Sequence, residues 1–144
     1  MNITNLFTKY AEDFELTFLD DDWSRLEQYF TENAIYKTGG VFSSESRGRE
    51  NILAVLRANI SRFDRKCDSR RLETIDGPHV TGVILKRRWR CNFTLRGATD
   101  LSIIGDEHVH YEGTRICKLE ESLTNDSQLL LSDWIKKHKS TMER

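Results

Sequence analysis

The hydrophobic pattern of this chain changes its period once, near Arg70, and that change limits the folds that the chain can adopt. Before it, apolar residues recur at every third or fourth position, which is typical of amphipathic helices. After it, apolar and polar residues alternate, which is typical of strands with one buried face. Helices followed by a run of strands predict an α+β fold, in which the helices cover one face of an antiparallel sheet.

The apolar stripes predict three helices in the first half of the chain and a short helix near the C-terminus. The first stripe consists of large side chains on one helix face: Ile3, Phe7, Tyr10, Phe14 and Phe18. The predicted helices occupy residues 3–18, 23–30, 52–63 and 127–138, with a short strand at 34–38. Basic residues share the other face of the third helix, and we interpret them as solvated: Arg57, Arg62, Arg65 and Lys66.

The alternating part of the chain predicts four strands, at residues 70–75, 83–95, 101–112 and 115–123. The last of them offers two faces of different polarity. The more apolar face, which we place inward, carries Cys117, Leu119, Glu121 and Leu123. The other face carries Ile116, Lys118, Glu120 and Ser122. A slip of one residue would exchange the two faces.

The composition excludes several classes of partner. The 144 residues predict one domain spanning 1–144, since no repeat, low-complexity stretch or Ser/Gly linker interrupts them. Apolar residues make up 38% and charged residues 31%, as expected for a polar surface around a modest core. The formal charge of −1 gives no overall field to attract nucleic acid or an anionic membrane, so we expect neither as a partner.

The predicted location is the cytoplasm. The N-terminal residues lack the basic start and the apolar run of a signal peptide. The longest apolar runs, such as 83–85 and 129–131, are far too short to span a bilayer. Cys67, Cys91 and Cys117 lie far apart without Cys-x-x-Cys spacing, which argues against a disulfide framework or a zinc site.

The order of the elements and three local segments resemble a known family. The segments are the acidic start, apolar helix and aromatic-acidic run at 21–36, the Gly48-x-x-x-Ile52 opening of the third helix, and the turn at 112–116. Over nearly the whole chain this pattern resembles NTF2-like proteins of the SnoaL-like and ketosteroid-isomerase-like kind. The resemblance implies three N-terminal helices packed on a curved antiparallel sheet, a short C-terminal helix, a cone-shaped hydrophobic pocket and a homodimer.

The same fold serves isomerases, polyketide cyclases, dehydratases, epoxide hydrolases and non-catalytic partner-binding proteins, so the resemblance does not name a function. Of the three residues that ketosteroid isomerases use, the tyrosine position holds Phe14, the base position holds Thr38, and Glu107 alone is similar in kind. That reaction is therefore not expected. The Arg-x-Asp arrangement of the epoxide hydrolases is also missing from the long strand at 83–95.

A pair of acidic residues gives the leading hypothesis. Polyketide cyclases of this family place an acid/base pair on the last two strands, and the inward positions there are held by Glu107 and Glu121. A turn centred near residue 98 predicts Trp89 opposite Glu107, and a three-residue turn at 112–114 predicts Leu119 opposite it, with Glu121 on a diagonal. Burial among such side chains raises a carboxyl pKa, so the pair could exchange protons with a carbonyl compound.

A competing interpretation of Glu107 stays open. Arg87 lies on the same inward stripe, and a buried charge needs a partner. An ion pair between Arg87 and Glu107 would hold that carboxylate ionised and idle. The chain would then be a non-catalytic module that binds a ligand or another protein.

Polar residues on the opposite face of the strand at 101–112 suggest a metal site only weakly. Asp106, His108, His110 and Glu112 project the same way, and His-x-His on a strand can chelate a metal. Cross-strand ion pairs such as Arg90–Asp106 explain the charges without one. We predict no metal and no cofactor, and we interpret this face as solvated or as a dimer surface.

The expected function is binding of a small apolar molecule, with isomerase or cyclase chemistry on a carbonyl compound carried by Glu107 and Glu121. The residues expected to line the pocket are mostly aromatic or inward-facing: Phe14, Phe18, Tyr36, Thr38, Arg87, Trp89 and Leu119.

Overall fold

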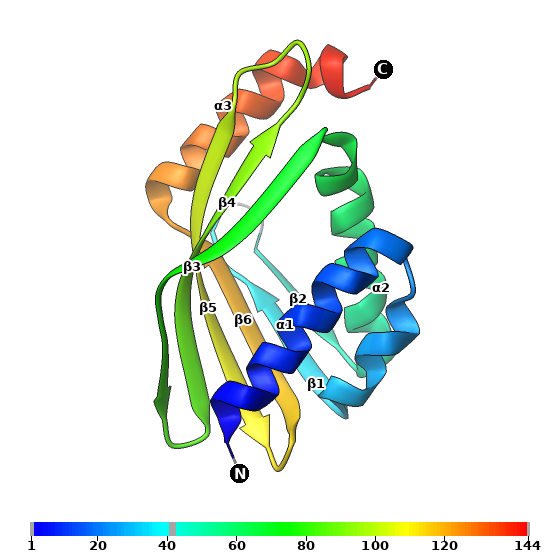
Figure 1. Cartoon of the computed structure of the whole chain (residues 1–144), viewed down its shortest axis with the longest axis vertical. Helices are drawn as coiled ribbons and strands as arrows, with labels where there is room; N and C mark the ends of the chain where they lie inside the picture. Colours follow the sequence, from blue (N-terminus) through cyan, green and yellow to red (C-terminus); the bar gives the residue numbers. More distant parts are fainter. Residues whose placement is uncertain (1, 41–42, 144) are drawn as a thin grey trace.

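The computed structural model describes residues 2–40 and 43–143 and shows a curved sheet with helices on its concave face (Figure 1). The helical layer consists of α1 (Ile3–Asp20), the 3-10 helix η1 (Trp23–Tyr29) and α2 (Arg49–Arg62). After a short turn, η2 (Asp64–Lys66), the chain enters the sheet, and α3 (Asn125–Met142) follows the last strand. None of these helices is long and apolar enough to cross a membrane. The α+β architecture predicted from the sequence is confirmed.

The sheet has the strand order β2-β1-β6-β5-β4-β3. Its strands are β1 (Phe30–Thr38), β2 (Ser44–Arg47), β3 (Ser69–Thr81), β4 (Ile84–Thr94), β5 (Leu101–Glu112) and β6 (Arg115–Leu123). β1 pairs with β6 in parallel and the other neighbours are antiparallel, so the sheet is mixed and the expectation of a wholly antiparallel sheet is wrong. Alternation marks which residues face the core, but it carries no information on the direction in which distant strands pair.

Some boundaries differ from the predicted ones. Phe30 was expected at the end of the second helix but begins β1, which is longer than the predicted 34–38. β3 continues to Thr81, beyond the predicted 70–75, because bulges near Asp76 let it follow β4 past its turn residues. β2 was not predicted, since Ser44–Arg47 carries no apolar alternation.

Two apolar clusters fill the space between the helices and the sheet. The first lies under α1, η1 and α2, and its fully buried members are Leu26, Phe30, Ala34, Ile52, Leu85, Val109, Ile116 and Leu119. The second lies under α3 and is centred on Trp134, which packs on Phe63 and donates a hydrogen bond of 2.7 Å to the Thr99 carbonyl. The helices are therefore held on one face of the sheet, around its concave side.

The register of β5 differs by small amounts from the predicted one, with large consequences. Arg87, not Trp89, lies opposite Glu107, because the β4–β5 pairing is centred near residue 97, one residue earlier than expected. On the other side, Glu121 and not Leu119 lies opposite Glu107. Two differences of one residue each combine there: the turn spans 113–114 instead of 112–114, and the register shifts between His110 and Tyr111. The same irregularity buries both Ile116 and Leu119, so the predicted division of β6 into two strict faces is wrong.

A second consequence of this register is the contact between Trp89 and Gly105, which lie directly opposite each other on β4 and β5. A Cβ atom added to Gly105 would lie 2.3 Å from Cζ2 of the Trp89 ring. The ring therefore occupies the space that a side chain at position 105 would need. Because the Trp89 ring fills this space, a glycine interrupts the apolar stripe of β5 at position 105.

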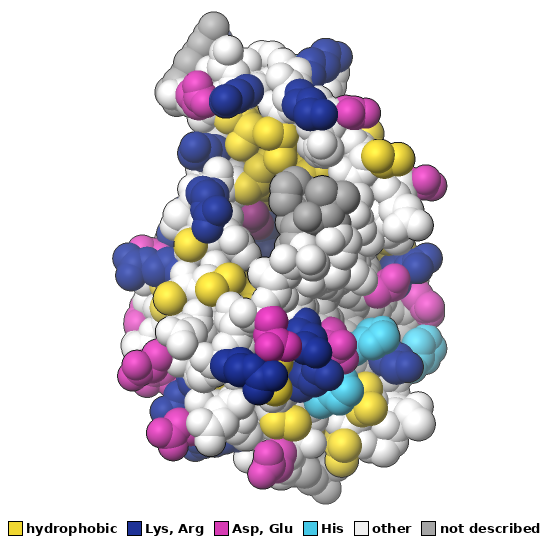
Figure 2. Space-filling model, turned by 180° about the vertical axis from the view of Figure 1, so that it is seen from behind, with side chains coloured by type: hydrophobic (Ala, Val, Ile, Leu, Met, Phe, Trp, Pro, Cys, Tyr) yellow, Lys and Arg dark blue, Asp and Glu magenta, His cyan; other side chains and the backbone are white. Residues whose placement is uncertain are grey.

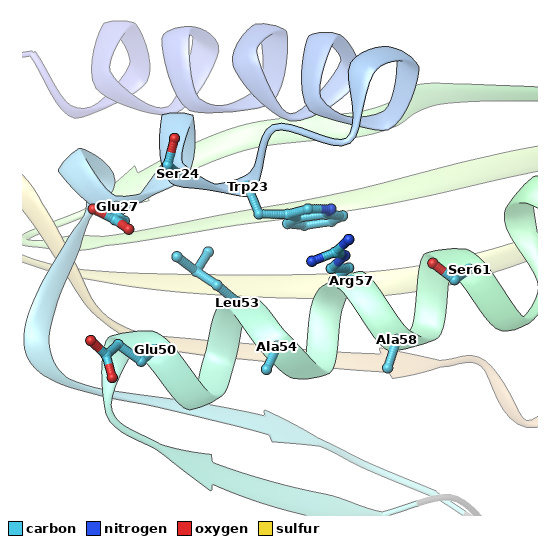
Figure 3. A pocket seen from close by; sticks show the side chains of 9 residues that line it. All are labelled: Trp23, Ser24, Glu27, Glu50, Leu53, Ala54, Arg57, Ala58 and Ser61. Carbon is cyan, nitrogen blue, oxygen red and sulfur yellow. The ribbon is translucent and has the colours of Figure 1, made fainter.

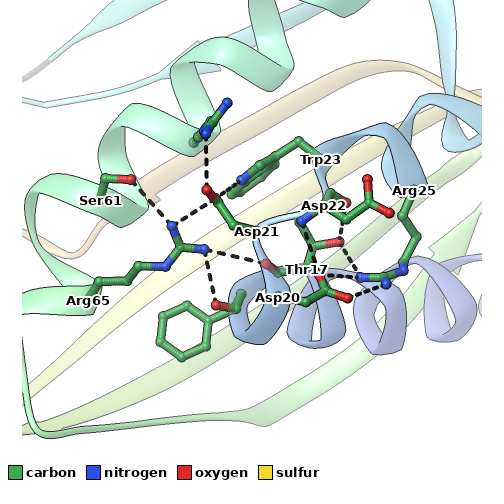
Figure 4. A network of polar contacts seen from close by, with 10 residues as sticks. Thr17, Asp20, Asp21, Asp22, Trp23, Arg25, Ser61 and Arg65 are labelled. Carbon is green, nitrogen blue, oxygen red and sulfur yellow. Dashed lines mark hydrogen bonds and ion pairs between the residues drawn. The ribbon is translucent and has the colours of Figure 1, made fainter.

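The helical layer is tied together at Asp21, which has a left-handed backbone (φ 61°) at the end of α1 (Figure 4). Its carboxylate accepts hydrogen bonds from Trp23 Nε1 (2.7 Å), Arg57 (3.0 Å) and Arg65 (2.8 Å). Arg65 also donates to the carbonyls of Thr17 and Phe18 in the last turn of α1. Arg57 is exposed, as predicted for a solvated face, although it also pairs with Asp21. The predicted solvated role is wrong for Arg65, whose side chain is 27% exposed and whose partners lie in a segment distant in sequence.

We expect Gly105→Ala to lower the free energy of unfolding by about 2 kcal/mol, because the new methyl group forces the Trp89 ring out of place. Chemical denaturation measures this change. The matched background is Trp89→Leu, in which the ring is gone. If Gly105→Ala is equally costly in both backgrounds, steric conflict with Trp89 is not its cause.

We expect Arg65→Met to destabilise the protein by about 1–2 kcal/mol, because the C-terminal carbonyls of α1 and the Asp21 carboxylate lose a charged donor. Thermal or chemical unfolding measures the loss. Arg62→Met is the control, since Arg62 is an exposed arginine three residues earlier, at the end of α2. Equal effects of the two substitutions would contradict a specific role for the Asp21 network.

Candidate functional site

Four neighbouring strands place polar side chains together on the concave face of the sheet. Arg87 on β4, Glu107 on β5 and Glu121 on β6 are direct cross-strand partners. Arg87 Nε donates to Glu107 Oε1 at 2.7 Å. Tyr36 on β1 completes the row, because its hydroxyl donates to Glu121 Oε2 at 2.9 Å. We call Tyr36, Arg87, Glu107 and Glu121 the carboxyl cluster.

The carboxyl cluster is largely shielded from water. Glu107 is 2% exposed and Tyr36 is 3% exposed, whereas Arg87 and Glu121 are half-buried. The Arg87 guanidinium also donates to Thr74 Oγ1 (3.0 Å) and lies over the Phe7 ring. The inward position of Glu107 that the sequence predicted is therefore present, and so is the ion pair with Arg87 that the competing interpretation required.

The surroundings raise the pKa of Glu121 well above its ordinary value of 4.5. Burial is the largest cause, followed by the charge of Glu107 and a hydrogen bond with it. The Tyr36 hydrogen bond and the Arg87 charge act in the opposite direction and are smaller. Since one guanidinium faces two carboxyls, the cluster favours a state in which Glu121 keeps its proton and Arg87 balances an ionised Glu107.

Two further tyrosines, which were not among the predicted site residues, lie near the cluster. Tyr10 on α1 is 4% exposed, and its pKa is raised well above the usual value by burial and by the charges of Glu107 and Glu121. Tyr111 on β5 is equally buried, and its hydroxyl has no hydrogen-bond partner among the described residues. Both occur within apolar stripes of the sequence, where a tyrosine is interpreted as a core residue. The sequence pattern gives no sign that its hydroxyl belongs to a functional site.

The other residues that were predicted to line the pocket pack in the core or make contacts away from the carboxyl cluster. Phe14 packs against Tyr10 and Trp23, and Phe18 lies under the Arg70 guanidinium at 4.9 Å. Leu119 is fully buried in the first apolar cluster, and Trp89 covers Gly105. Thr38 lies opposite Glu121 across the parallel pairing, while its hydroxyl lies 2.8 Å from that of Ser44. The structure thus brings Tyr36 and Arg87 into direct contact with the two carboxyls.

A second buried polar group was also missed. Arg70, whose side chain is 7% exposed, binds Glu15 at 2.7 Å and Asp64 at 2.6 Å. Burial raises the pKa of Asp64, although the Arg70 charge opposes the shift. The sequence gives no signal for this group, since its members come from α1, η2 and β3.

The convex face of the sheet carries mixed charges and histidines, visible in the lower half of Figure 2. Arg88 pairs with Asp106 at 2.9 Å, so the predicted partner Arg90 is wrong; Arg90 lies nearer Glu73 instead. His110 lies 2.9 Å from Glu120. Within residues 2–40 and 43–143, no three His, Cys, Asp or Glu side chains gather as metal ligands would.

A cavity of about 550 Å³ lies outside the carboxyl cluster, between η1 and α2 (Figure 3). Its walls are formed by Trp23, Ser24, Glu27, Glu50, Leu53, Ala54, Arg57, Ala58 and Ser61. None of the residues predicted to line a pocket belongs to it.

Comparison with known proteins gives structural but not sequence relatives. No family model matches the chain, and a search of curated proteins finds no significant match. Many solved structures match. A SnoaL-like polyketide cyclase, so described, from Shewanella denitrificans aligns over 94% of this chain and 97% of its own, with a TM-score of 0.69 and 12% identity.

Two other solved structures are similar to this chain. A protein described as an isomerase from Bacillus subtilis aligns over 94% of this chain and 96% of its own (TM-score 0.70, 11% identity). A protein with a ketosteroid isomerase-like fold from Catenulispora acidiphila, in complex with trimethylamine, aligns over 87% and 91% (TM-score 0.63, 13% identity). At such low identity the likeness concerns the fold alone. The chain has the NTF2-like fold of the SnoaL-like and ketosteroid isomerase-like proteins.

Proposed function

We propose that this protein binds a small molecule beside the carboxyl cluster and exchanges a proton with it through Glu121. The expected guest is a small apolar carbonyl compound, and the expected chemistry is that of an isomerase or a cyclase. One observation carries this proposal: a carboxyl with a strongly raised pKa faces a second, buried carboxyl that an arginine holds in place.

The contacts give the two carboxyls different roles. Protonated Glu121 donates its proton to the carbonyl oxygen of the guest, and the resulting carboxylate takes a proton from the carbon next to that carbonyl, which converts the ketone into its enol. In the reverse direction it donates to the enol carbon and takes the proton from the enol hydroxyl. Glu107 is a positioning residue, since its charge keeps the proton on Glu121 while Arg87 fixes its side chain. This division replaces the symmetric acid/base pair expected from the sequence.

Two further observations support the binding of a guest. The Tyr111 hydroxyl, which lacks a partner among the described residues, can donate a hydrogen bond to a polar atom. A structural neighbour of the same fold was solved in complex with trimethylamine, a small organic molecule. Homodimer formation, a cytoplasmic location and a single domain stay predictions of this proposal.

A non-catalytic module is the second candidate function. The ion pair between Arg87 and Glu107 at 2.7 Å favours it, because a buried ion pair can fix a core without taking part in any reaction. In that case the protein would bind a ligand or another protein, and Glu121 would be a protonated core residue.

We expect the carboxyl carbon of Glu121 to titrate well above the ordinary glutamate value in an NMR experiment. Glu107→Gln should lower the Glu121 pKa, because a neighbouring negative charge is removed. Tyr36→Phe should raise it, because the hydrogen bond that favours the ionised form is lost. Shifts of opposite sign in the two variants are the expected signature, and an ordinary pKa in the parent protein would refute the proposal.

The proton on Glu121 also makes the stability of the protein depend on pH. The folded state binds this proton more tightly than the unfolded chain does, because the pKa of Glu121 is raised on folding. The free energy of unfolding should therefore fall as the pH rises from about 4.5 toward the raised pKa of Glu121. In Glu121→Gln this contribution to the decline should disappear. An unchanged slope in that variant would place the responsible group elsewhere.

We expect Glu121→Gln to reduce turnover of an active carbonyl substrate by at least about 100-fold, since general acid–base catalysis contributes about that much. Ligand affinity should change little, because glutamine keeps the hydrogen bonds to Tyr36 and Glu107. Steady-state kinetics and calorimetry on a panel of small ketones and enones make the measurement. Tight binding without turnover by the parent protein would favour the non-catalytic module.

A further inference from the structure

The cavity between η1 and α2 is a separate surface site whose chemistry can be read from its walls. Its volume is about 550 Å³, and it is a groove open to solvent and not an enclosed cavity. The helix α2 stands between it and the interior of the cone, because Ile52, Leu56 and Ile60 face the core while Ala54 and Ala58 line the cavity. The site is therefore distinct from the carboxyl cluster.

One wall of the site is a fixed aromatic surface. Trp23 is 7% exposed, and its indole nitrogen donates to Asp21 at 2.7 Å, which fixes the orientation of the ring. Leu53 adds hydrocarbon beside it. Ala54 and Ala58 lie one turn apart on α2, and their short side chains leave the groove open. This wall suits a flat apolar body.

One end of the site is negatively charged. Glu27 from η1 and Glu50 from α2 lie at the same end of the groove (Figure 3). Both are exposed, and neither forms an ion pair within the described part of the chain. Arg57, at the other end of the groove, shares the Asp21 carboxylate with Arg65, so its charge is only partly matched. The unpaired negative charge therefore lies at one end of the apolar wall, and the positive charge of Arg57 lies away from it.

We propose that this groove binds a small organic cation, namely an ammonium group attached to a flat apolar or aromatic body. The ammonium lies between the Glu27 and Glu50 carboxylates, and the body lies on Trp23 and Leu53. An aromatic face beside carboxylates favours a cation through both its quadrupole and its charge complementarity. A molecule of the same shape with a carboxylate in place of the ammonium is repelled at that end.

Tryptamine and indole-3-propionate are matched probes, because they share the indole ring and the two-carbon chain and differ in the charged group. We expect tryptamine to shift the Trp23 Nε1–H resonance in an NMR titration at low salt, with indole-3-propionate at least fivefold weaker. Glu27→Gln/Glu50→Gln should weaken tryptamine binding about fivefold, as expected for partly screened charges. Ala58→Leu should abolish it by filling the groove while leaving the carboxylates in place.

Glu121→Gln is the control, since it alters the carboxyl cluster and leaves the groove intact; tryptamine binding should be unchanged. Loss of binding in that variant would place the cation in the cone and overturn the proposal for the groove. Equal binding of the two probes, or unchanged tryptamine binding in Ala58→Leu, would overturn it as well. A failure of the proposed proton-transfer function has no effect on these outcomes.

Discussion

The most consequential interaction in this protein is the meeting of two carboxyl groups and one guanidinium on the concave face of the sheet. Arg87 satisfies Glu107 with a bond of 2.7 Å, and Glu121 is left with Tyr36 and the neighbouring carboxyl. Two buried negative charges with a single positive partner are costly, and the least costly remedy is a retained proton. The raised pKa of Glu121 therefore follows from the arrangement of three adjacent strands and not from any one residue.

That arrangement depends on the registers of β4, β5 and β6, in which a shift of one or two residues changes which side chains meet. A shift by two residues between β4 and β5 would place Trp89 opposite Glu107, and Arg87 would lose its direct partner. Without the irregularity near Tyr111, Glu120 and not Glu121 would lie opposite Glu107. Gly105 takes part as well, because it provides room for the Trp89 ring two residues before Glu107. A turn centre and a bulge thus decide whether the chain has a pair of facing carboxyls at all.

Most of the fold could be predicted, and less of the site. Helical and alternating periods mark the elements because they reflect burial, and burial also marks Glu107 as an acid within an apolar stripe. Pairing direction, register and the contributions of Tyr10 and Tyr111 come from contacts between distant segments, which no local pattern encodes. The same limit explains Arg65, which looks like part of a solvated helix face and instead holds the end of α1 through Asp21 and two backbone carbonyls.

The helix α2 separates two environments that call for opposite chemistry. On its inner side, Ile52, Leu56 and Ile60 help to exclude water from the concave face, where burial makes a carboxyl keep its proton. On its outer side, Glu50 stays exposed to water beside an open groove, where it can attract a cation. Glutamate therefore has two distinct roles within a short distance of one helix. The difference comes from access to water, since the side chain and its intrinsic acidity are the same in both places.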